Sequence, residues 1–168
     1  MSKTAFLPHI AQIPELCFRA GIRRCIISPG SRNAPLIAAF ARHPAVQSYV
    51  VPDERSAAFI GLGMALKISE PTALVCTSGT AVLNYFPAVA EAFYQEIPLL
   101  ILTADRPPEL LDRHEGQTIR QRNVYGGYNW DTRVRNRSAK YTATLGSEAV
   151  ADWNPMPEQT ATAPMLES

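Results

Sequence analysis

The sequence predicts an α/β protein with a doubly wound, mostly parallel sheet and helices on both faces. Two observations lead to this prediction. Short apolar segments alternate with helical segments from residue 22 to residue 111, which is the order of repeated strand–helix–strand units. The apolar segments are solid runs without regular alternation, which is typical of strands covered on both faces.

The first half of this alternation gives two strands and three helices. A helix is expected over residues 5–20, where apolar side chains recur at helical spacing and Gly21 follows as a C-cap. A strand at 22–28 ends in a turn rich in Pro, Gly, Ser and Asn, and a helix follows at 34–42 with Pro35 in its first turn. A second strand at 46–51 precedes a helix at 54–67.

The second half adds two more strands. A strand at 72–77 leads through residues 78–80 into a helix that Pro87 should kink, because proline removes a backbone donor and clashes with the preceding turn. A fourth strand is expected at 98–103, followed by a short helical turn at 109–111. No apolar strand run follows, so we expect one domain over residues 1–125. Residues 126–168 are then a tail that is disordered, dependent on a partner, or the product of a truncation or frame change.

The helix at 54–67 is apolar nearly all round, which predicts a buried helix. Gly61 and Gly63 each cost about 1 kcal/mol of helix propensity relative to alanine, which indicates that a neighbouring backbone lies close to them. Glu54 occupies the first turn, where free N–H groups and the helix dipole favour a carboxylate. Two interpretations of Glu54 stay open: an acid that only stabilises its helix, and a functional carboxylate.

Composition narrows the function classes. The formal net charge of +1 gives no reason to expect nucleic acid or an anionic membrane surface as a partner. Cys17, Cys25 and Cys76 lie in apolar contexts without pairing or metal-ligand spacing, so we expect buried free thiols in a reducing compartment and no metal site. The sequence shows neither a signal peptide nor an apolar run long enough to cross a bilayer, which predicts a cytoplasmic protein.

Unusual polar residues follow each predicted strand. Ligands of parallel sheets bind beyond the carboxyl ends of the strands, so we expect these residues to converge at one edge. In chain order they are Ser31 and Arg32, Asp53 and Glu54, Ser78, Gly79 and Thr80, and Asp105 and Arg106.

Several of these residue types suit recognition of a charged ligand. Guanidinium groups bind carboxylates in a bidentate way, so Arg32 and Arg106 suit a carboxylate substrate; solvated surface arginines, or Arg106 paired with Asp105, are the alternative. The turn at 78–80 can hold an anion or a polar ring through backbone N–H groups, or can be a simple N-cap. Gln117 can add a hydrogen bond or be an exposed loop amide.

Six short segments carry a resemblance to a known family. They are 27–36 (ISPGSRNAPL), 53–57 (DERSA), 77–81 (TSGTA), 102–110 (LTADRPPEL), 117–121 (QTIRQ) and 123–125 (NVY). In order and spacing they resemble the N-terminal part of the 2-succinyl-5-enolpyruvyl-6-hydroxy-3-cyclohexene-1-carboxylate synthases, the thiamine-diphosphate enzymes of menaquinone biosynthesis. The resemblance covers residues up to about Tyr125 and implies a pyrimidine-binding (PYR) domain.

The resemblance implies roles for the candidate residues. Glu54 matches the family glutamate that hydrogen-bonds N1′ of the thiamine aminopyrimidine and so promotes loss of the C2 proton. Thr77, Ser78, Gly79 and Thr80 match the loop that packs near the pyrimidine. Ser31, Arg32, Arg106 and Gln117 match positions on the isochorismate side. The implied transferase reaction decarboxylates 2-oxoglutarate and adds the succinyl-semialdehyde unit to isochorismate.

The sequence also departs from the family. It contains no Gly-Asp-Gly motif, so the implied Mg²⁺ and diphosphate ligands would come from another domain or chain. The family implies a homo-oligomer, a dimer in which the Glu54 helix and the helix after Ser78 are interface surfaces, and little or no activity of this chain alone. The alternatives are a split-chain PYR subunit of another thiamine-diphosphate decarboxylase and a non-catalytic assembly module with this fold.

Overall fold

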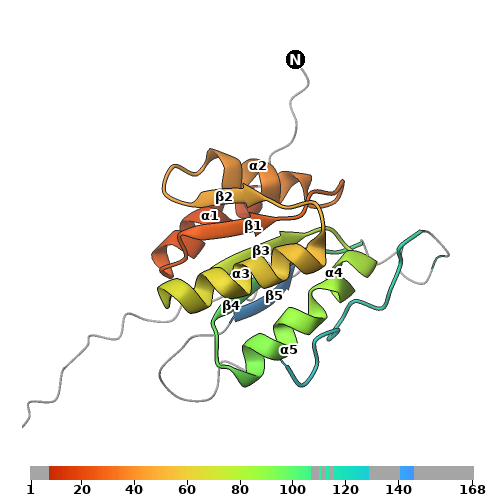
Figure 1. Ribbon diagram of the computed structural model, residues 1–168. Coiled ribbons are helices and arrows are strands. Elements are labelled where there is room, and N and C mark those ends of the chain that lie inside the picture. Colours follow the sequence, from red (N-terminus) through yellow and green to blue (C-terminus); the bar gives the residue numbers. More distant parts are fainter. Residues whose placement is uncertain (1–7, 107–109, 111–112, 114–115, 129–140, 146–168) are drawn as a thin grey trace, which may run out of the picture.

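The computed structural model describes residues 8–106, 110, 113, 116–128 and 141–145, and the structural statements below concern these residues. Its centre is a five-stranded parallel sheet with strand order β2-β1-β3-β4-β5 (Figure 1). The strands are β1 (Arg24–Ile27), β2 (Gln47–Val50), β3 (Thr72–Cys76), β4 (Leu99–Ala104) and β5 (Tyr141–Leu145). The helices are α1 (Pro8–Arg19), α2 (Ala34–Arg42), α3 (Glu54–Ile68), α4 (Thr80–Asn84) and α5 (Phe86–Tyr94).

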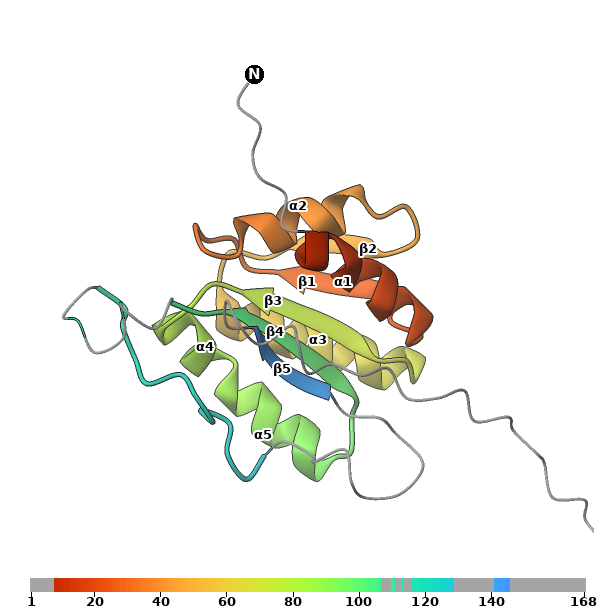
Figure 2. The same cartoon turned by 180° about the vertical axis from the view of Figure 1, so that it is seen from behind.

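Helices cover both faces of the sheet, as Figures 1 and 2 show from opposite sides. Helices α1 and α2 lie on one face, and α3, α4 and α5 lie on the other. Successive residues of β1 divide between the two hydrophobic cores, because side chains alternate across a strand. Ile26 joins the core under α3 and α5, whereas Cys25 and Ile27 join the core under α1 and α2. The predicted doubly wound α/β fold is therefore confirmed.

The register brings the carboxyl ends of the strands to one edge. Ile27 pairs with Val50 on one side and with Val75 on the other, and Val75 pairs with Leu102. The turns that follow these residues therefore begin at nearly the same level. This edge lies on the right in Figure 1, where β2 passes into α3.

Most predicted element bounds agree with the structure to within a few residues. Helix α2 has the predicted bounds, and the first-turn position of Pro35 leaves no backbone donor unsatisfied. The predicted kink at Pro87 is a complete break: α4 ends at Asn84, and α5 begins at Phe86 with Pro87 in its first turn. The predicted turn at 109–111 and the start of the first helix at 5–7 lie outside the described residues, apart from Leu110.

A further strand, β5, lies beyond Tyr125, in the segment where the sequence shows no apolar strand run. Strand β5 pairs in parallel with β4, from Leu100 opposite Tyr141 to Ala104 opposite Leu145. Its sequence, YTATL, is short and alternates with threonine, so it lacks the solid apolar run that marked the other strands. The sheet thus takes one strand from the segment expected to be a tail.

Helix α3 is buried on one side only, which corrects the prediction of a buried helix. Ala57, Ala58, Leu62 and Ala65 are buried against the sheet and α5. Its other side exposes large hydrophobic side chains, with exposed fractions of 45% for Phe59, 42% for Ile60 and 59% for Leu66.

The two glycines of α3 have different surroundings. A Cβ on Gly61 would overlap the Leu74 side chain on β3, so the close neighbour is a side chain and not the expected backbone. A Cβ on Gly63 would meet no atom of the described chain within 4 Å, so the prediction of a close neighbour is wrong there. Gly63 belongs instead to the exposed side of the helix.

The three cysteines are buried free thiols, as predicted. Burial raises the pKa of Cys17 and of Cys76 to about 12, because a thiolate loses its hydration in the core. Among the described helices, none has the length and apolar character needed to span a membrane.

Candidate functional site

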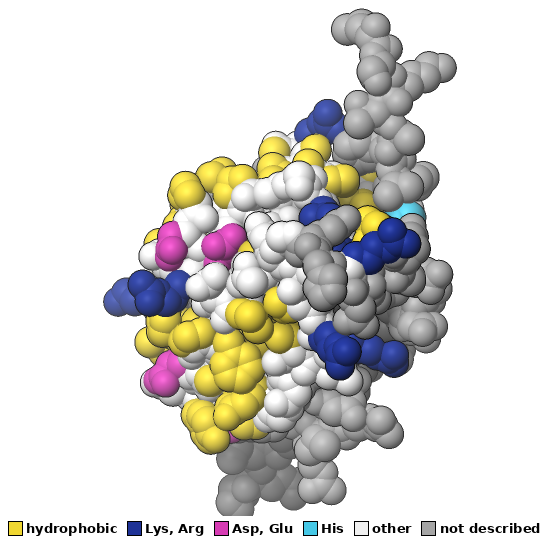
Figure 3. Space-filling view, turned by 90° about the vertical axis from the view of Figure 1, so that its right-hand side faces the viewer, with side chains coloured by type: hydrophobic (Ala, Val, Ile, Leu, Met, Phe, Trp, Pro, Cys, Tyr) yellow, Lys and Arg dark blue, Asp and Glu magenta, His cyan; other side chains and the backbone are white. Residues whose placement is uncertain are grey.

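The candidate site lies at the edge formed by the carboxyl ends of the strands, and Figure 3 views this edge directly. Hydrophobic, basic and acidic side chains all reach this face. The segments after β1, β2, β3 and β4 each bring one group of the predicted site residues to it. The parallel order of the strands is therefore what gathers residues that lie far apart in sequence.

Arg106 is held in place by two side-chain hydrogen bonds. Its side chain is buried, with an exposed fraction of 5%. The guanidinium Nη1 donates to Ser78 Oγ at 3.2 Å, and Nη2 donates to the Gly116 carbonyl oxygen at 2.7 Å. The interpretation of Arg106 as a solvated surface arginine is therefore wrong. Asp105 has a local role as well, since its carboxylate accepts the backbone N–H of Arg106 at 2.7 Å.

The turn before α4 is closed by residues 117–121. Gly79, at φ +84°, donates its N–H to Gln121 Oε1 at 2.9 Å, and Thr80 donates its N–H to the Gln117 carbonyl oxygen at 3.1 Å. The N–H groups of Gly79 and Thr80 are therefore satisfied within the chain and are not free to bind an anion or a polar ring. A simple side-chain N-cap is also absent from this helix, because the N-cap residue is Gly79.

Close packing accompanies these bonds. A Cβ on Gly79 would overlap the Gln117 carbonyl oxygen, so only glycine fits at this turn. Gln117 itself has φ +58°, a conformation that is uncommon for a residue with a side chain. Its carbonyl oxygen accepts a hydrogen bond from the first residue of α4, Thr80, while its side chain is exposed. Gln117 thus contacts the turn before α4 through its carbonyl group, and the role expected for its side chain stays a prediction.

Sequence reasoning missed Gln121, which makes more buried hydrogen bonds than Gln117. Its carboxamide accepts from Gly79 and donates Nε2–H to Thr103 Oγ1 at 3.1 Å and to the Ala104 carbonyl oxygen at 2.7 Å. Only the burial of this side chain, with an exposed fraction of 2%, distinguishes it from other loop amides. No signal in the sequence separates the two glutamines of the QTIRQ segment.

Glu54 begins α3 at the end of β2 and is half-buried. The neighbouring Asp53 is the N-cap: its Oδ1 accepts the Ser56 N–H at 2.7 Å, and this bond holds the pKa of Asp53 below its usual range. Burial raises the pKa of Cys76, at the end of β3, and the Glu54 charge raises it by a smaller amount. Helix capping is therefore provided by Asp53 and does not require Glu54.

Residues 29–32 form the turn after β1. Gly30 packs directly against Thr77, so close that an added Cβ would lie 2.5 Å from the Thr77 Cβ. This contact brings the Ser31 and Arg32 turn next to the Ser78 turn. Ser31 is exposed and Arg32 is half-buried. Asn33 is fully buried and donates to the Ser28 carbonyl oxygen at 2.9 Å, which fixes the turn from below.

The structure therefore brings the predicted residues to one edge but ties them together unequally. Hydrogen bonds that also involve Gly116 and Gln121 link five of them: Ser78, Gly79, Thr80, Arg106 and Gln117. Thr77 is nearly buried under the Gly30 turn. Ser31, Arg32 and Glu54 lie at the ends of the two neighbouring strands, β1 and β2.

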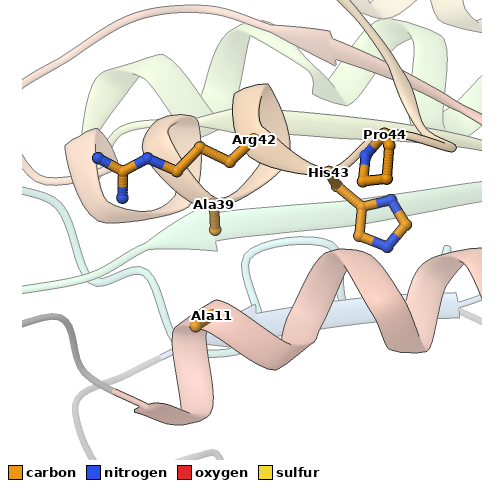
Figure 4. Close-up of a pocket in the computed structure, with 5 residues that line it drawn as sticks. All are labelled: Ala11, Ala39, Arg42, His43 and Pro44. Atoms are coloured by element: carbon orange, nitrogen blue, oxygen red, sulfur yellow. The ribbon is translucent and has the colours of Figure 1, made fainter.

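A hollow in the surface lies elsewhere. It is lined by Ala11, Ala39, Arg42, His43 and Pro44, between α1 and the end of α2 (Figure 4). Ala39, Arg42, His43 and Pro44 lie in α2 or in the loop that leads to the amino end of β2, on the opposite edge from the strand carboxyl ends. His43 Nε2 lies 3.1 Å from Glu15 Oε2 there. Because ligands of parallel sheets bind at the carboxyl edge, we place the site with Arg106 and Glu54 and not in this hollow.

Comparison with known proteins agrees with this geometry. Residues 11–124 match the family described as "Thiamine pyrophosphate enzyme, N-terminal TPP binding domain". The chain belongs to the thiamine pyrophosphate enzyme family. The matched residues include β1 to β4 and every predicted site residue.

Two curated relatives that match the chain are both named 2-succinyl-5-enolpyruvyl-6-hydroxy-3-cyclohexene-1-carboxylate synthase. The chain is 57% identical to the Cytophaga hutchinsonii protein over 120 residues, which are 71% of the chain and 22% of that relative. It is 46% identical to the Christiangramia forsetii protein over 150 residues, which are 89% of the chain and 24% of that relative. The chain thus spans about a quarter of the length of these relatives.

Proposed function

We propose that this chain is the pyrimidine-binding part of a synthase that uses thiamine diphosphate to decarboxylate 2-oxoglutarate and to add the succinyl-semialdehyde unit to isochorismate. One observation supports this most directly. The Arg106 guanidinium joins Ser78 to Gly116, which fixes three segments of the predicted site at one edge of the sheet. A relative with the synthase name is 57% identical to this chain over 120 residues.

The residues present fit the aminopyrimidine end of the cofactor. Glu54 offers a half-buried carboxylate at the carboxyl edge, where it can accept or share a proton with a ring nitrogen. Since Asp53 supplies the helix cap, Glu54 is not needed for that role. When bound, thiamine diphosphate supplies a nucleophilic carbon and an electron sink for decarboxylation. Its diphosphate and Mg²⁺ would be held by residues outside this sequence.

The arginines suit the substrate side. Both proposed substrates carry carboxylates, and the guanidinium group of arginine stays charged and presents several donors in a fixed plane. Arg106 is already oriented by Ser78 and Gly116, so little rotational freedom is lost when an anion binds near it. Arg32 and Ser31, on the neighbouring turn, complete the proposed isochorismate side.

Exposed hydrophobic side chains on α3, α4 and α5 support the proposal that this chain has protein partners. Phe59, Ile60 and Leu66 on α3, Leu83 on α4 and Tyr94 on α5 are large and exposed. Exposed hydrophobic clusters of this kind mark interaction surfaces. We therefore propose that the chain pairs with a diphosphate-binding domain or chain that carries a Gly-Asp-Gly motif, and that it forms a homo-oligomer. We also propose a cytoplasmic location.

Reconstitution tests the proposal. The chain is mixed with a Cytophaga hutchinsonii relative from which the matching 120 residues have been removed. Consumption of isochorismate is followed in the presence of 2-oxoglutarate, thiamine diphosphate and Mg²⁺. We expect turnover from the mixture and none from either polypeptide alone. Turnover by this chain alone, or a complex that assembles in a sizing experiment but stays inactive, would contradict the proposal.

A further inference from the structure

Gln121 lies where three segments of the site meet. One end of its carboxamide accepts from Gly79, at the turn after β3. The other end donates to Thr103 Oγ1 and to the Ala104 carbonyl oxygen, at the end of β4. The side chain is 2% exposed, and Thr103 is fully buried. Because a buried polar group left without a partner is costly, the three bonds hold the segment around Gln121 strongly in place.

The same segment makes two further hydrogen bonds with residues of the site. The Gln117 carbonyl oxygen accepts the Thr80 N–H, and the Gly116 carbonyl oxygen accepts from the Arg106 guanidinium. Both hydrogen bonds require residues 116–121 to pack against the turn before α4. Gly79 allows this close approach because it has no Cβ. The Gln121 side chain bonds to residues at both strand ends.

We propose that Gln121 is a positioning residue: its buried carboxamide locks residues 116–121 onto the turn before α4 and thereby sets where Gln117 and Arg106 lie. The relevance of this lock to catalysis rests on the function proposed above. A glutamine is required because one atom of the group must accept from Gly79 while the other donates to Ala104. An ionised carboxylate provides only the first of these bonds.

In the variant Gln121→Glu, the hydrogen bond to the Ala104 carbonyl oxygen should depend on pH. A protonated carboxyl can accept from Gly79 and donate to Ala104, as the amide does. An ionised carboxylate would place two acceptors together at the Ala104 carbonyl oxygen. Burial raises the pKa of such a carboxyl, so the Gln121→Glu side chain should ionise, and lose its bond to Ala104, between about pH 5 and pH 8. The control is Gln12→Glu, on an exposed position of α1.

Amide hydrogen exchange of the full chain, measured by NMR without added cofactor, gives the readout. The Thr80 N–H is the decisive probe, because its acceptor is Gln117 and not the substituted side chain. We expect its protection in Gln121→Glu to fall about tenfold relative to wild type as the pH rises, as expected for the loss of one buried hydrogen bond. The Leu74 amide in β3 should keep its protection, and Gln12→Glu should match wild type at Thr80.

A parallel variant, Gln121→Leu, should lower Thr80 protection at every pH. Equal Thr80 protection in Gln121→Glu and wild type across the pH range would overturn the proposal. So would an equal loss at Thr80 and Leu74, because it would show general destabilisation. This result does not depend on turnover. If Thr80 responds as expected but the reconstituted wild type is inactive, the lock stands and the proposed function fails.

Discussion

The Arg106 guanidinium lies 3.2 Å from the Ser78 hydroxyl and so ties the end of β4 to the end of β3. Both side chains are buried, and the second guanidinium nitrogen holds the Gly116 carbonyl oxygen. The position of Arg106 is therefore set by the fold before any ligand binds. Its charge at the edge of the sheet is a fixed feature of the site.

Arg106→Ala should destabilise the protein by roughly 2 to 4 kcal/mol, because it leaves a buried hydroxyl and a carbonyl group without their donor. Urea unfolding measures the change. Arg106→Lys should fall between wild type and alanine, since one ammonium group cannot reproduce the planar fork. The control is Arg55→Ala, at an exposed position, which should change stability by less than about 0.5 kcal/mol. A loss from Arg106→Ala as small as the loss from this control would contradict the structural role.

Gly79 and Gly21 form a matched pair for testing the closed turn. Their φ angles are +84° and +83°, but a Cβ on Gly79 would overlap Gln117, whereas a Cβ on Gly21 would meet nothing within 4 Å. Gly21→Ala should cost only the backbone strain, about 1 kcal/mol. Gly79→Ala should cost at least about 2 kcal/mol more, because residues 116–121 must move away. Thermal unfolding of both variants checks this, and equal losses would show that the turn is open.

Asp53 should stabilise α3 in a pH-dependent way. Its bond to the Ser56 N–H holds its pKa below the ordinary value of 3.8, so its contribution is fully present above that value and is lost as the pH falls through the lowered pKa. Asp53→Ala should therefore unfold at lower urea than wild type at pH 7, and the difference should shrink below about pH 4. Asparagine also caps helices, so Asp53→Asn should retain most of the stability at pH 7. A difference between alanine and wild type that stays constant down to pH 2 would be inconsistent with this cap.

The exposed side of α3 should be needed for assembly and not for folding. Ile60→Glu places a charge on the hydrophobic surface, so its dissociation constant for the supplied polypeptide should rise at least about tenfold. Its unfolding free energy should stay within about 0.5 kcal/mol of wild type, because Ile60 is already 42% exposed. Lys67→Glu, on an exposed position near the end of α3, is the control for added negative charge. Binding by Ile60→Glu with the affinity of wild type would move the interface to another surface.

The sequence predicted the layers and most elements because strong local signals agreed there. Solid apolar runs marked β1, β3 and β4, and proline positions marked the start of α2 and the break before α5. Strand β5 was missed because its residues alternate with threonine and its pairing with β4 is a long-range contact. The exposed side of α3 was also missed, since an apolar helix gives the same pattern whether its own chain or another covers it.

The candidate site was predicted in outline but not in its contacts. The rule that ligands bind at strand carboxyl ends located Glu54, Ser78 and Arg106 at one edge. It did not predict that the Gln117 carbonyl oxygen would accept a hydrogen bond from the Thr80 N–H, or that the Gln121 side chain would be buried. Those contacts join a loop to a turn that lies 37 to 42 residues earlier in the chain, and local sequence patterns carry no information about such contacts.

The central claim is that Glu54 serves the chemistry of a thiamine-diphosphate enzyme, and the reconstituted mixture tests it most directly. Glu54→Gln removes the ionisable group with little change in shape, and Asp53 still caps α3. Isochorismate consumption should fall at least about a hundredfold, the size expected when a group that assists proton transfer is lost. Complex formation and the unfolding free energy should match wild type. Consumption at the wild-type rate by the Glu54→Gln mixture would contradict the account.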